Sequence, residues 1–180
     1  MFLTDIWLIQ CFFGVNMKIL VFSDSHGDIS RMSEIVARNR SDTDIVIHLG
    51  DRKSDIDEVM HDYPNIAKIS VVGNCDGISA YALSSSLEHT MTIEGYKFYI
   101  THGHHNDVKS GIYSLMREAK SKNYNIVLYG HSHVAKYDKI NGIHYFNPGS
   151  ISYPRGCQLP SYGLINIKNN NVEFQIIEVE

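Results

Sequence analysis

Five short apolar runs in this chain each end just before a residue that can bind a metal ion. The runs are residues 21–22 before Asp24 and His26, 45–49 before Asp51, 69–72 before Asn74, 98–101 before His102, and 126–129 before His131 and His133. Short β-rich apolar runs predict buried strands. Because ligands in open α/β sheets gather beyond the carboxyl ends of the strands, we expect these seven N and O donors to converge at one edge.

The first half of the chain alternates strand and helix patterns. We expect strands at residues 17–22, 45–49 and 66–72, with helices at 30–40 and 56–63 between them. Ser30 is a suitable N-cap for the first helix, and Pro64 ends the second. Alternation of this kind predicts parallel pairing of the strands.

The second half is mostly strand. A helical spacing of apolar residues predicts a helix at 110–122, and strands are expected at 91–93, 97–101, 134–140, 143–146, 162–167 and 172–179. The dipeptides Glu94-Gly95 and Asn141-Gly142 indicate hairpin turns. Two sheets with helices outside them follow from this order, and no repeat or linker divides the chain.

Size and charge limit the function classes. With 180 residues and 20.4 kDa, the chain fits one domain, which we place at residues 17–180. The net charge of −4 and the pI near 6.2 give no basic surface for a polynucleotide, so no nucleic-acid partner is expected. The three cysteines, Cys11, Cys75 and Cys157, are odd in number and far apart, which favours a reducing, cytoplasmic location.

Residues 1–16 form an apolar N-terminal extension of doubtful function. They contain Asp5 and Gln10, lack a basic start and a small-residue cleavage site, and are too short to span a membrane. We expect them to lie outside the functional domain, which begins at Met17, and we expect no membrane partner. A peripheral anchor and a weak export signal are the alternatives.

Most of the ligand motifs are weak when taken alone, and the GHSH motif is the sharpest of them. Asp24-Ser25-His26 places two donors on one turn, while Gly50-Asp51 and Gly73-Asn74 are also ordinary turn sequences. In residues 130–133, GHSH, two imidazoles on alternate residues can face different ions, although an exposed histidine loop has the same pattern. Their order, with each member after an expected strand, is what favours a shared metal site.

Taken together, the motifs resemble the calcineurin-like metallophosphoesterases, and within them the small YfcE-type phosphodiesterases. The matching segments are residues 22–28 (FSDSHGD), 48–51 (HLGD), 72–76 (VGNCD), 101–104 (THGH), 130–133 (GHSH) and 147–150 (NPGS). The resemblance extends from Met17 to the end of the chain. It implies an α/β fold: a four-layer α/β/β/α sandwich of two mixed β-sheets flanked by helices, in agreement with the expected elements.

The resemblance also implies a dinuclear metal centre. By matching position, the first ion is held by Asp24, His26, Asp51 and His133, and the second by Asp51 as the bridge, Asn74, His102 and His131. The implied activity is hydrolysis of a small-molecule phosphodiester by a metal-bridging hydroxide, with Asp51 and Asn74 acting in catalysis. Mixed imidazole and carboxylate ligands favour Mn²⁺, with Ni²⁺, Fe²⁺, Co²⁺ or Zn²⁺ as alternatives, over Ca²⁺.

One position departs from the wider superfamily. Many members carry His after the Gly-Asn pair, whereas this chain has Cys75, as in the YfcE-like branch. A thiol is a weak replacement for imidazole as a general acid near neutral pH, so we expect faster turnover of activated diesters. His104 is a candidate for the missing acid, or for a hydrogen bond to a ligand. Asn74, Cys75 and Arg52 are candidates for binding substrate, although Arg52 also fits a solvated turn.

Other polar residues receive structural roles. His48 lies inside an apolar run and is expected to be a core histidine. Residues 147–150 are expected to support the GHSH loop, and Tyr153 and Arg155 are candidates for contact with substrate from an exposed turn.

A rival interpretation keeps the fold without the chemistry. A Vps29-like protein-interaction scaffold would have the same architecture and a vestigial metal site. Competent donors occupy all seven ligand positions here, which favours an enzyme. The physiological substrate and the oligomeric state, including a homo-oligomer, stay open.

Overall fold

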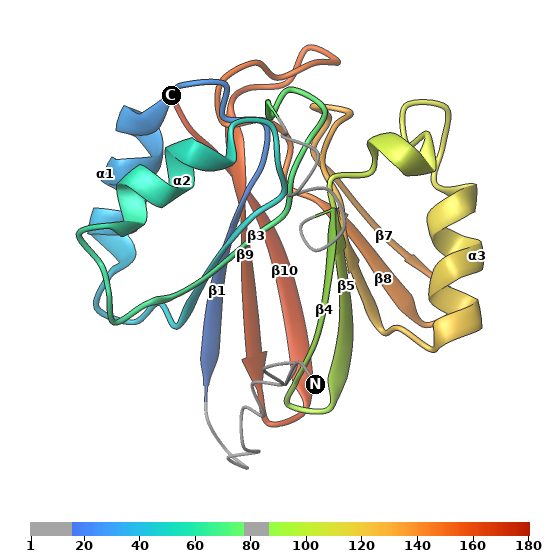
Figure 1. The fold of residues 1–180 in the computed structure, drawn as a ribbon. Coiled ribbons are helices and arrows are strands. Elements are labelled where there is room, and N and C mark those ends of the chain that lie inside the picture. Colours follow the sequence, from blue (N-terminus) through green and yellow to red (C-terminus); the bar gives the residue numbers. More distant parts are fainter. Residues whose placement is uncertain (1–15, 78–86) are drawn as a thin grey trace, which may run out of the picture.

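Two five-stranded β-sheets face each other, and α-helices cover their outer sides (Figure 1). The computed structural model describes residues 16–77 and 87–180, so the predicted extension lies outside them except for Asn16. In chain order the elements are β1 (Met17–Phe22), α1 (Ile29–Asn39), β2 (Ile45–His48), α2 (Lys53–Met60), β3 (Ala67–Ser70), β4 (Glu88–Ile93), β5 (Tyr96–Thr101), a 3-10 turn (His104–Asn106), α3 (Tyr113–Lys122), β6 (Ile126–Leu128), β7 (Lys136–Ile140), β8 (Ile143–Asn147), β9 (Ser161–Lys168) and β10 (Asn171–Glu178).

Both sheets are mixed. The first has the order β10-β9-β1-β2-β3. Strands β1, β2 and β3 pair in parallel, β9 pairs with β1 in antiparallel fashion, and β10 pairs with β9 in antiparallel fashion. The second has the order β4-β5-β6-β8-β7, in which β5, β6 and β8 are parallel. The expected parallel pairing of the first three strands is confirmed, as is the four-layer sandwich.

Three apolar layers hold the sandwich together. Alternate residues of β1 point to opposite sides, so that Ile19 and Val21 pack between the sheets while Leu20 and Phe22 pack under the helices. The helices α1 and α2 cover the first sheet, and α3 covers the second (Figure 1). Because both faces of the central strands are buried, their sequences are continuous apolar runs rather than alternating ones. That is why these strands stood out in the sequence.

Two helix starts differ from the sequence predictions. Helix α1 begins at Ile29, and Asp28 rather than Ser30 is its N-cap, accepting a hydrogen bond from the backbone N–H of Arg31. Helix α2 begins at Lys53, three residues before the predicted start at 56. Its first N–H donates to the carboxylate of Asp76, 2.6 Å away, which caps the helix from a distant loop.

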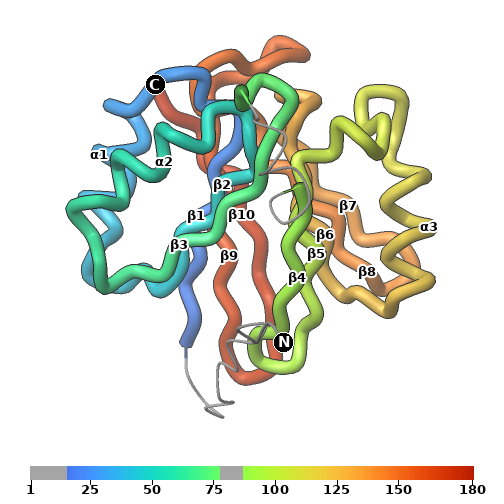
Figure 2. The backbone as a smooth tube through the Cα atoms, in the orientation of Figure 1, coloured from blue at the N-terminus to red at the C-terminus, as the bar shows by residue number. Residues whose placement is uncertain are grey.

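The carboxyl ends of the parallel strands from both sheets point to the same end of the molecule (Figure 2). The loops that follow β1, β2, β3, β5 and β6 therefore meet there, at the top of Figure 1. None of the helices among the described residues has the length and apolarity that a membrane crossing requires.

Candidate metal centre

The loops beyond β1, β2, β5 and β6 bring six of the seven predicted ligands together. They form two groups: Asp24, His26, Asp51 and His133, and Asp51, His102 and His131. Within each group, one donor atom from each residue lies within 4.8 Å of the others. The first group contains the four residues that the resemblance implied for the first ion, and the second contains those implied for the second ion except Asn74.

In the first group, nitrogen lone pairs and carboxylate oxygens face one another. The Nε2 atoms of His26 and His133 are 3.4 Å apart, and His133 Nε2 is 3.2 Å from Asp24 Oδ1. The ring of His133 is oriented from its other side, because Nδ1 donates to the carbonyl of Tyr153 at 2.7 Å. In the neutral tautomer, Nε2 then has no proton to share with its neighbours, which is the arrangement of a ligand set.

The second group has the same design. His102 donates from Nδ1 to the carbonyl of Leu49 at 2.6 Å, so its Nε2 points toward Asp51 Oδ1, 3.3 Å away. Among the described residues, the buried His102 Nε2 and Asp24 Oδ1 have no hydrogen-bond partner. Buried polar atoms are normally satisfied, so these two fit direct contact with a cation.

Asp51 belongs to both groups. Its Oδ1 faces His102 in the second group, while its Oδ2 lies 3.7 Å from His26 Nε2 in the first. A carboxylate that presents one oxygen to each of two imidazole sets has the geometry of a bridge. The donors present therefore fit two neighbouring divalent cations.

Five of the predicted ligand residues have positive φ angles, a conformation that costs a non-glycine residue about 1 kcal/mol or more. These residues are Asp24 (53°), His26 (45°), Asp51 (60°), His131 (63°) and His133 (58°). Such angles persist only where the surroundings hold them, and they cluster at functional sites.

The surroundings hold Asp24 on several sides. Its Oδ2 accepts hydrogen bonds from Ser23 Oγ at 2.5 Å and from the backbone N–H of His131 at 3.1 Å. Its main-chain carbonyl accepts from Ser150 Oγ and Ser152 Oγ at 2.8 and 3.0 Å. These bonds fix the carboxylate so that only Oδ1 remains free.

A second carboxylate, Asp76, organises the loops after β2 and β3. It accepts hydrogen bonds from the backbone N–H groups of Asp51, Lys53 and Gly73, at 3.1, 2.6 and 2.7 Å. The same loop reaches Asp51 directly, because the N–H of Cys75 donates to its Oδ1 at 2.8 Å. Asp76 therefore fixes the position of the bridging carboxylate.

The pairing of imidazoles with carboxylates shifts their pKa values. Burial opposes ionisation of Asp51, but the imidazole of His102, 3.3 Å away, outweighs it and holds the pKa of Asp51 well below its usual range. Burial likewise disfavours the charged form of His102, and Asp51 and Asp24 outweigh it and raise its pKa. Asp24 and His133 are shifted in the same sense. Because metal ligands bind in their deprotonated forms, binding of a cation by these residues would be coupled to release of protons.

Asn74 and Cys75 lie at the open side of the clusters. Both are exposed and line a cavity of about 310 Å³ together with Asp51. The amide nitrogen of Asn74 donates to Cys75 Sγ at 3.4 Å. Burial, and then Asp51, raise the pKa of the Cys75 thiol.

Two other predicted residues do not line this cavity. Arg52 is 3.7 Å from Asp55 through its Nε atom, and its side chain is about 55% exposed to solvent. His104 stacks 4.0 Å from His105 and 5.3 Å from His102, measured between ring centroids, and its Nδ1 has no partner among the described residues. Burial, followed by the charge of His105, lowers the pKa of His104 to about 4, which leaves it neutral near pH 7.

The structural roles expected for His48 and for residues 147–150 are confirmed. His48 is fully buried with both ring nitrogens in hydrogen bonds, as expected of a core histidine. Asn147 supports the GHSH loop by donating to the carbonyl of Gly130 and to Ser132 Oγ, both at 3.0 Å.

The cavity also has cationic and aromatic walls. Tyr153 and Arg155, expected from the sequence as substrate contacts, line it, and so does Lys109. The sequence did not indicate Lys109 as a residue of the site, because it belongs to no motif and does not follow an expected strand.

A sandwich of two mixed sheets with imidazole and carboxylate clusters beyond the strand ends is the architecture of a metallophosphoesterase. Residues 17–170 match the model of the calcineurin-like phosphoesterase superfamily domain, and the chain belongs to this superfamily.

Named relatives agree with the assignment. A probable metallophosphoesterase of Bacillus subtilis (strain 168), YsnB, is 31% identical over 155 residues, covering 86% of each chain. A phosphodiesterase of Methanocaldococcus jannaschii is 27% identical over 176 residues, covering 90% of this chain and all of the relative. The crystal structure of a predicted phosphoesterase from Streptococcus pneumoniae TIGR4 superposes with a TM-score of 0.75 and 28% identity, covering 92% of this chain and 94% of the other.

A more distant structure, that of a Vps29 protein, has a similar fold. Vps29 of Entamoeba histolytica, crystallised with Zn²⁺, matches with a TM-score of 0.66 and 19% identity, covering 89% of this chain and 98% of the other. At this identity the likeness concerns architecture alone.

Proposed function

We propose that the protein hydrolyses small-molecule phosphodiesters with the help of two divalent cations. The observation that supports this function most directly is the sharing of Asp51, whose two oxygens face separate imidazole groups. The first ion would be held by Asp24, His26, Asp51 and His133, and the second by Asp51, Asn74, His102 and His131. When bound, such a pair activates water, orients a phosphoryl group and offsets the charge that develops during in-line displacement.

The protein's own residues position these groups and the substrate. The carbonyls of Leu49 and Tyr153 fix the ligand rings of His102 and His133, so little rearrangement is needed on binding. Asn74 would orient a phosphoryl oxygen from the cavity wall and is therefore assigned a catalytic role with Asp51. The thiol of Cys75, whose pKa is raised, would stay protonated beside the substrate.

The substrate class is inferred from the volume of the cavity and from the net charge of the chain. A cavity of about 310 Å³ is at the lower end of the range for small-molecule pockets and suits a small diester. The net charge of −4 does not favour a polynucleotide. We include Mn²⁺ as the favoured metal and a cytoplasmic location in the proposal, the latter because the three cysteines are widely separated.

The experiment is hydrolysis of bis-p-nitrophenyl phosphate with and without added Mn²⁺ or Ni²⁺. We expect metal to be required, and Asp51→Ala to lower kcat/KM by roughly a hundredfold or more, since it removes a ligand from both groups. His61→Ala, at an exposed position at the end of α2, is the matched control. A rate that is independent of metal, or unchanged in Asp51→Ala, contradicts the proposal and favours the Vps29-like scaffold.

A further inference from the structure

Two cationic side chains at the wall of the cavity have no part in holding metal. Lys109 follows the 3-10 turn, and Arg155 lies in the loop between β8 and β9. They come from distant parts of the chain and line one cavity with His131 and His133. The cavity thus has positive groups beside the ligands of both proposed ions.

Neither cation is neutralised by an acidic side chain among the described residues. The ion pairs there use Lys18, Arg31, Arg38, Arg52, Lys53, Lys68, Lys122 and Lys136. In a protein of net charge −4, many basic residues are paired, yet two at the metal cavity are not. The acidic side chain that also lines the cavity, Asp51, is assigned to the metal groups, so Lys109 and Arg155 remain to attract anions to the cavity.

Both cations lie close to the ligand loop. Lys109 lines the same cavity as His131 of the ligand loop. The backbone N–H of Arg155 donates to the carbonyl of His133 at 2.9 Å, which attaches its loop to the ligand loop. Arg155 is therefore held at the site by its backbone while its side chain stays exposed.

A simple diester leaves these charges without a partner. It carries one negative charge, at the phosphoryl group, which the metal clusters are suited to bind. Lys109 and Arg155 would then remain free for a second negative group on the same molecule. An arginine is particularly suited to carboxylate and phosphate oxygens, because its planar fork donates two parallel hydrogen bonds.

We infer that the cavity selects phosphodiesters bearing a second anionic group, and that Lys109 and Arg155 bind this group at the rim. The inference rests on the proposed function, because it assumes that the diester occupies the metal clusters. It makes the two cations specificity-determining residues and narrows the substrate class from diesters in general to anionic diesters.

The test compares two diesters that differ in one charge. Both release p-nitrophenolate. The 4-carboxyphenyl ester of p-nitrophenyl phosphate carries a carboxylate as its second anionic group, and the 4-carbamoylphenyl ester has an uncharged amide in the same place. For the unaltered protein we expect a KM about five- to tenfold lower for the carboxylate, the combined effect of two partly exposed ion pairs. This preference should shrink as salt is added, because exposed charges are screened.

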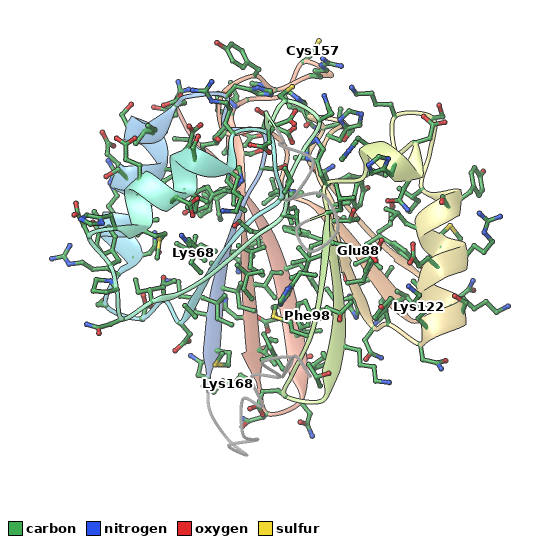
Figure 3. The ribbon with its side chains drawn as sticks, viewed as in Figure 1. Lys68, Glu88, Phe98, Lys122, Cys157 and Lys168 are labelled. Carbon is green, nitrogen blue, oxygen red and sulfur yellow. The ribbon has the colours of Figure 1, made fainter. Side chains whose placement is uncertain are left out.

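Variants assign the effect to the two side chains. In the double variant Lys109→Met/Arg155→Met, the preference should fall to about equality, whereas Lys109→Arg should keep it. Lys168→Met is the matched control: Lys168 is exposed, forms no ion pair among the described residues, and lies at the end of the molecule opposite Cys157 (Figure 3). It removes one positive charge away from the cavity and should leave the preference intact.

A binding measurement separates this inference from the proposed function. Calorimetry of the Mn²⁺-loaded protein with 4-carboxybenzylphosphonate and 4-carbamoylbenzylphosphonate needs no turnover, because neither compound has an ester bond. If no diester is hydrolysed but 4-carboxybenzylphosphonate binds more tightly than its amide through Lys109 and Arg155, the proposed function fails. The inference that these two residues bind an anionic group is then still supported. Equal affinity for the two compounds, or a preference that survives in the double variant, overturns the inference.

Discussion

The Nε2 atom of His48 lies 3.1 Å from the Oγ atom of Ser25, and this contact joins the loop after β1 to the end of β2. His48 Nδ1 accepts a hydrogen bond from the N–H of Gly50, so the ring proton is on Nε2 and donates to Ser25. Ser25 Oγ donates in turn to the carboxylate of Asp55 at 2.8 Å. A buried chain of hydrogen bonds thus fixes two of the loops that present the proposed ligands.

This chain of bonds predicts that stability depends on pH. Burial lowers the pKa of His48 to about 4, because nearby carboxylates only partly offset it. The unfolded chain binds the proton with a pKa near 6.5, so the stabilisation is complete above that pH and is lost as the pH falls toward 4. The shift corresponds to about 3 kcal/mol. His48→Gln keeps a donor and an acceptor but does not titrate.

Urea unfolding of the metal-free protein at pH 7 and pH 4.5 measures this effect. We expect the free energy of unfolding to be lower at pH 4.5 than at pH 7 in both proteins. The decrease should be about 2 kcal/mol smaller in His48→Gln than in the unaltered protein. An identical pH dependence in both proteins would mean that His48 is not held neutral by the fold.

The crowding around Gly50 yields a second prediction. Gly50 has a φ of 98°, and a Cβ atom there would lie 2.7 Å from the N atom of Gly73 and 2.9 Å from His102 Nδ1. Gly27 has nearly the same φ, 99°, but nothing within 4 Å of its Cβ position. Both alanine variants bear the backbone cost of about 1 kcal/mol, and only Gly50→Ala also displaces neighbours, so it should lose at least about 2 kcal/mol more.

Thermal or urea unfolding of the two variants, compared at one pH, tests this difference. Because His102 is one of the groups displaced, Gly50→Ala should also weaken Mn²⁺ binding. Equal losses of stability in Gly50→Ala and Gly27→Ala would show that the loops after β2 and β3 have room to move apart.

The number of metal ions bound by the two ligand groups can be measured directly. Calorimetric titration of metal-free protein with Mn²⁺ should give two sites per chain, about one in His131→Ala and none in Asp51→Ala, since His131 belongs to one group and Asp51 to both. Saturating Mn²⁺ should raise the stability by about 3 kcal/mol at a hundredfold excess over Kd, and EDTA should reverse this. Two intact sites in Asp51→Ala would contradict the bridging role.

The strand ends were predictable from the sequence for a physical reason. Val21 and Phe22 face opposite layers, and both layers are apolar, so the central strands form continuous apolar runs that end where the chain reaches the ligand loops. The pairs Asp24 and His26, and His131 and His133, could be recognised in the sequence because each directly follows the end of such a strand. Short-range patterns suffice where a residue's environment is set by its own strand.

Other features depend on partners far away in the sequence. Asp76 caps α2 from 23 residues beyond its first residue, so the polar stretch at the start of that helix gave no helical pattern. The positive φ angle of Asp24 is held by Ser150 and Ser152, which are more than a hundred residues away. Lys109 belongs to the cavity only because the 3-10 turn brings it there. Such contacts become visible only once the chain is folded.

Cys75 provides the last prediction, which concerns the leaving group. Its thiol lines the cavity, and burial together with the neighbouring Asp51 raises its pKa, so it is a poor proton donor near neutral pH. An imidazole at this position should protonate a departing alkoxide or phenolate of high pKa. We therefore expect Cys75→His to increase kcat for diesters with poor leaving groups, such as methyl p-cresyl phosphate, by about a hundredfold. Bis-p-nitrophenyl phosphate, whose leaving group needs no acid, should change far less. The measurement is the dependence of kcat on leaving-group pKa, with Cys75→Ser as the control that changes the side chain without adding an acid of suitable pKa. A slope equally steep in all three proteins would show that position 75 takes no part in proton transfer.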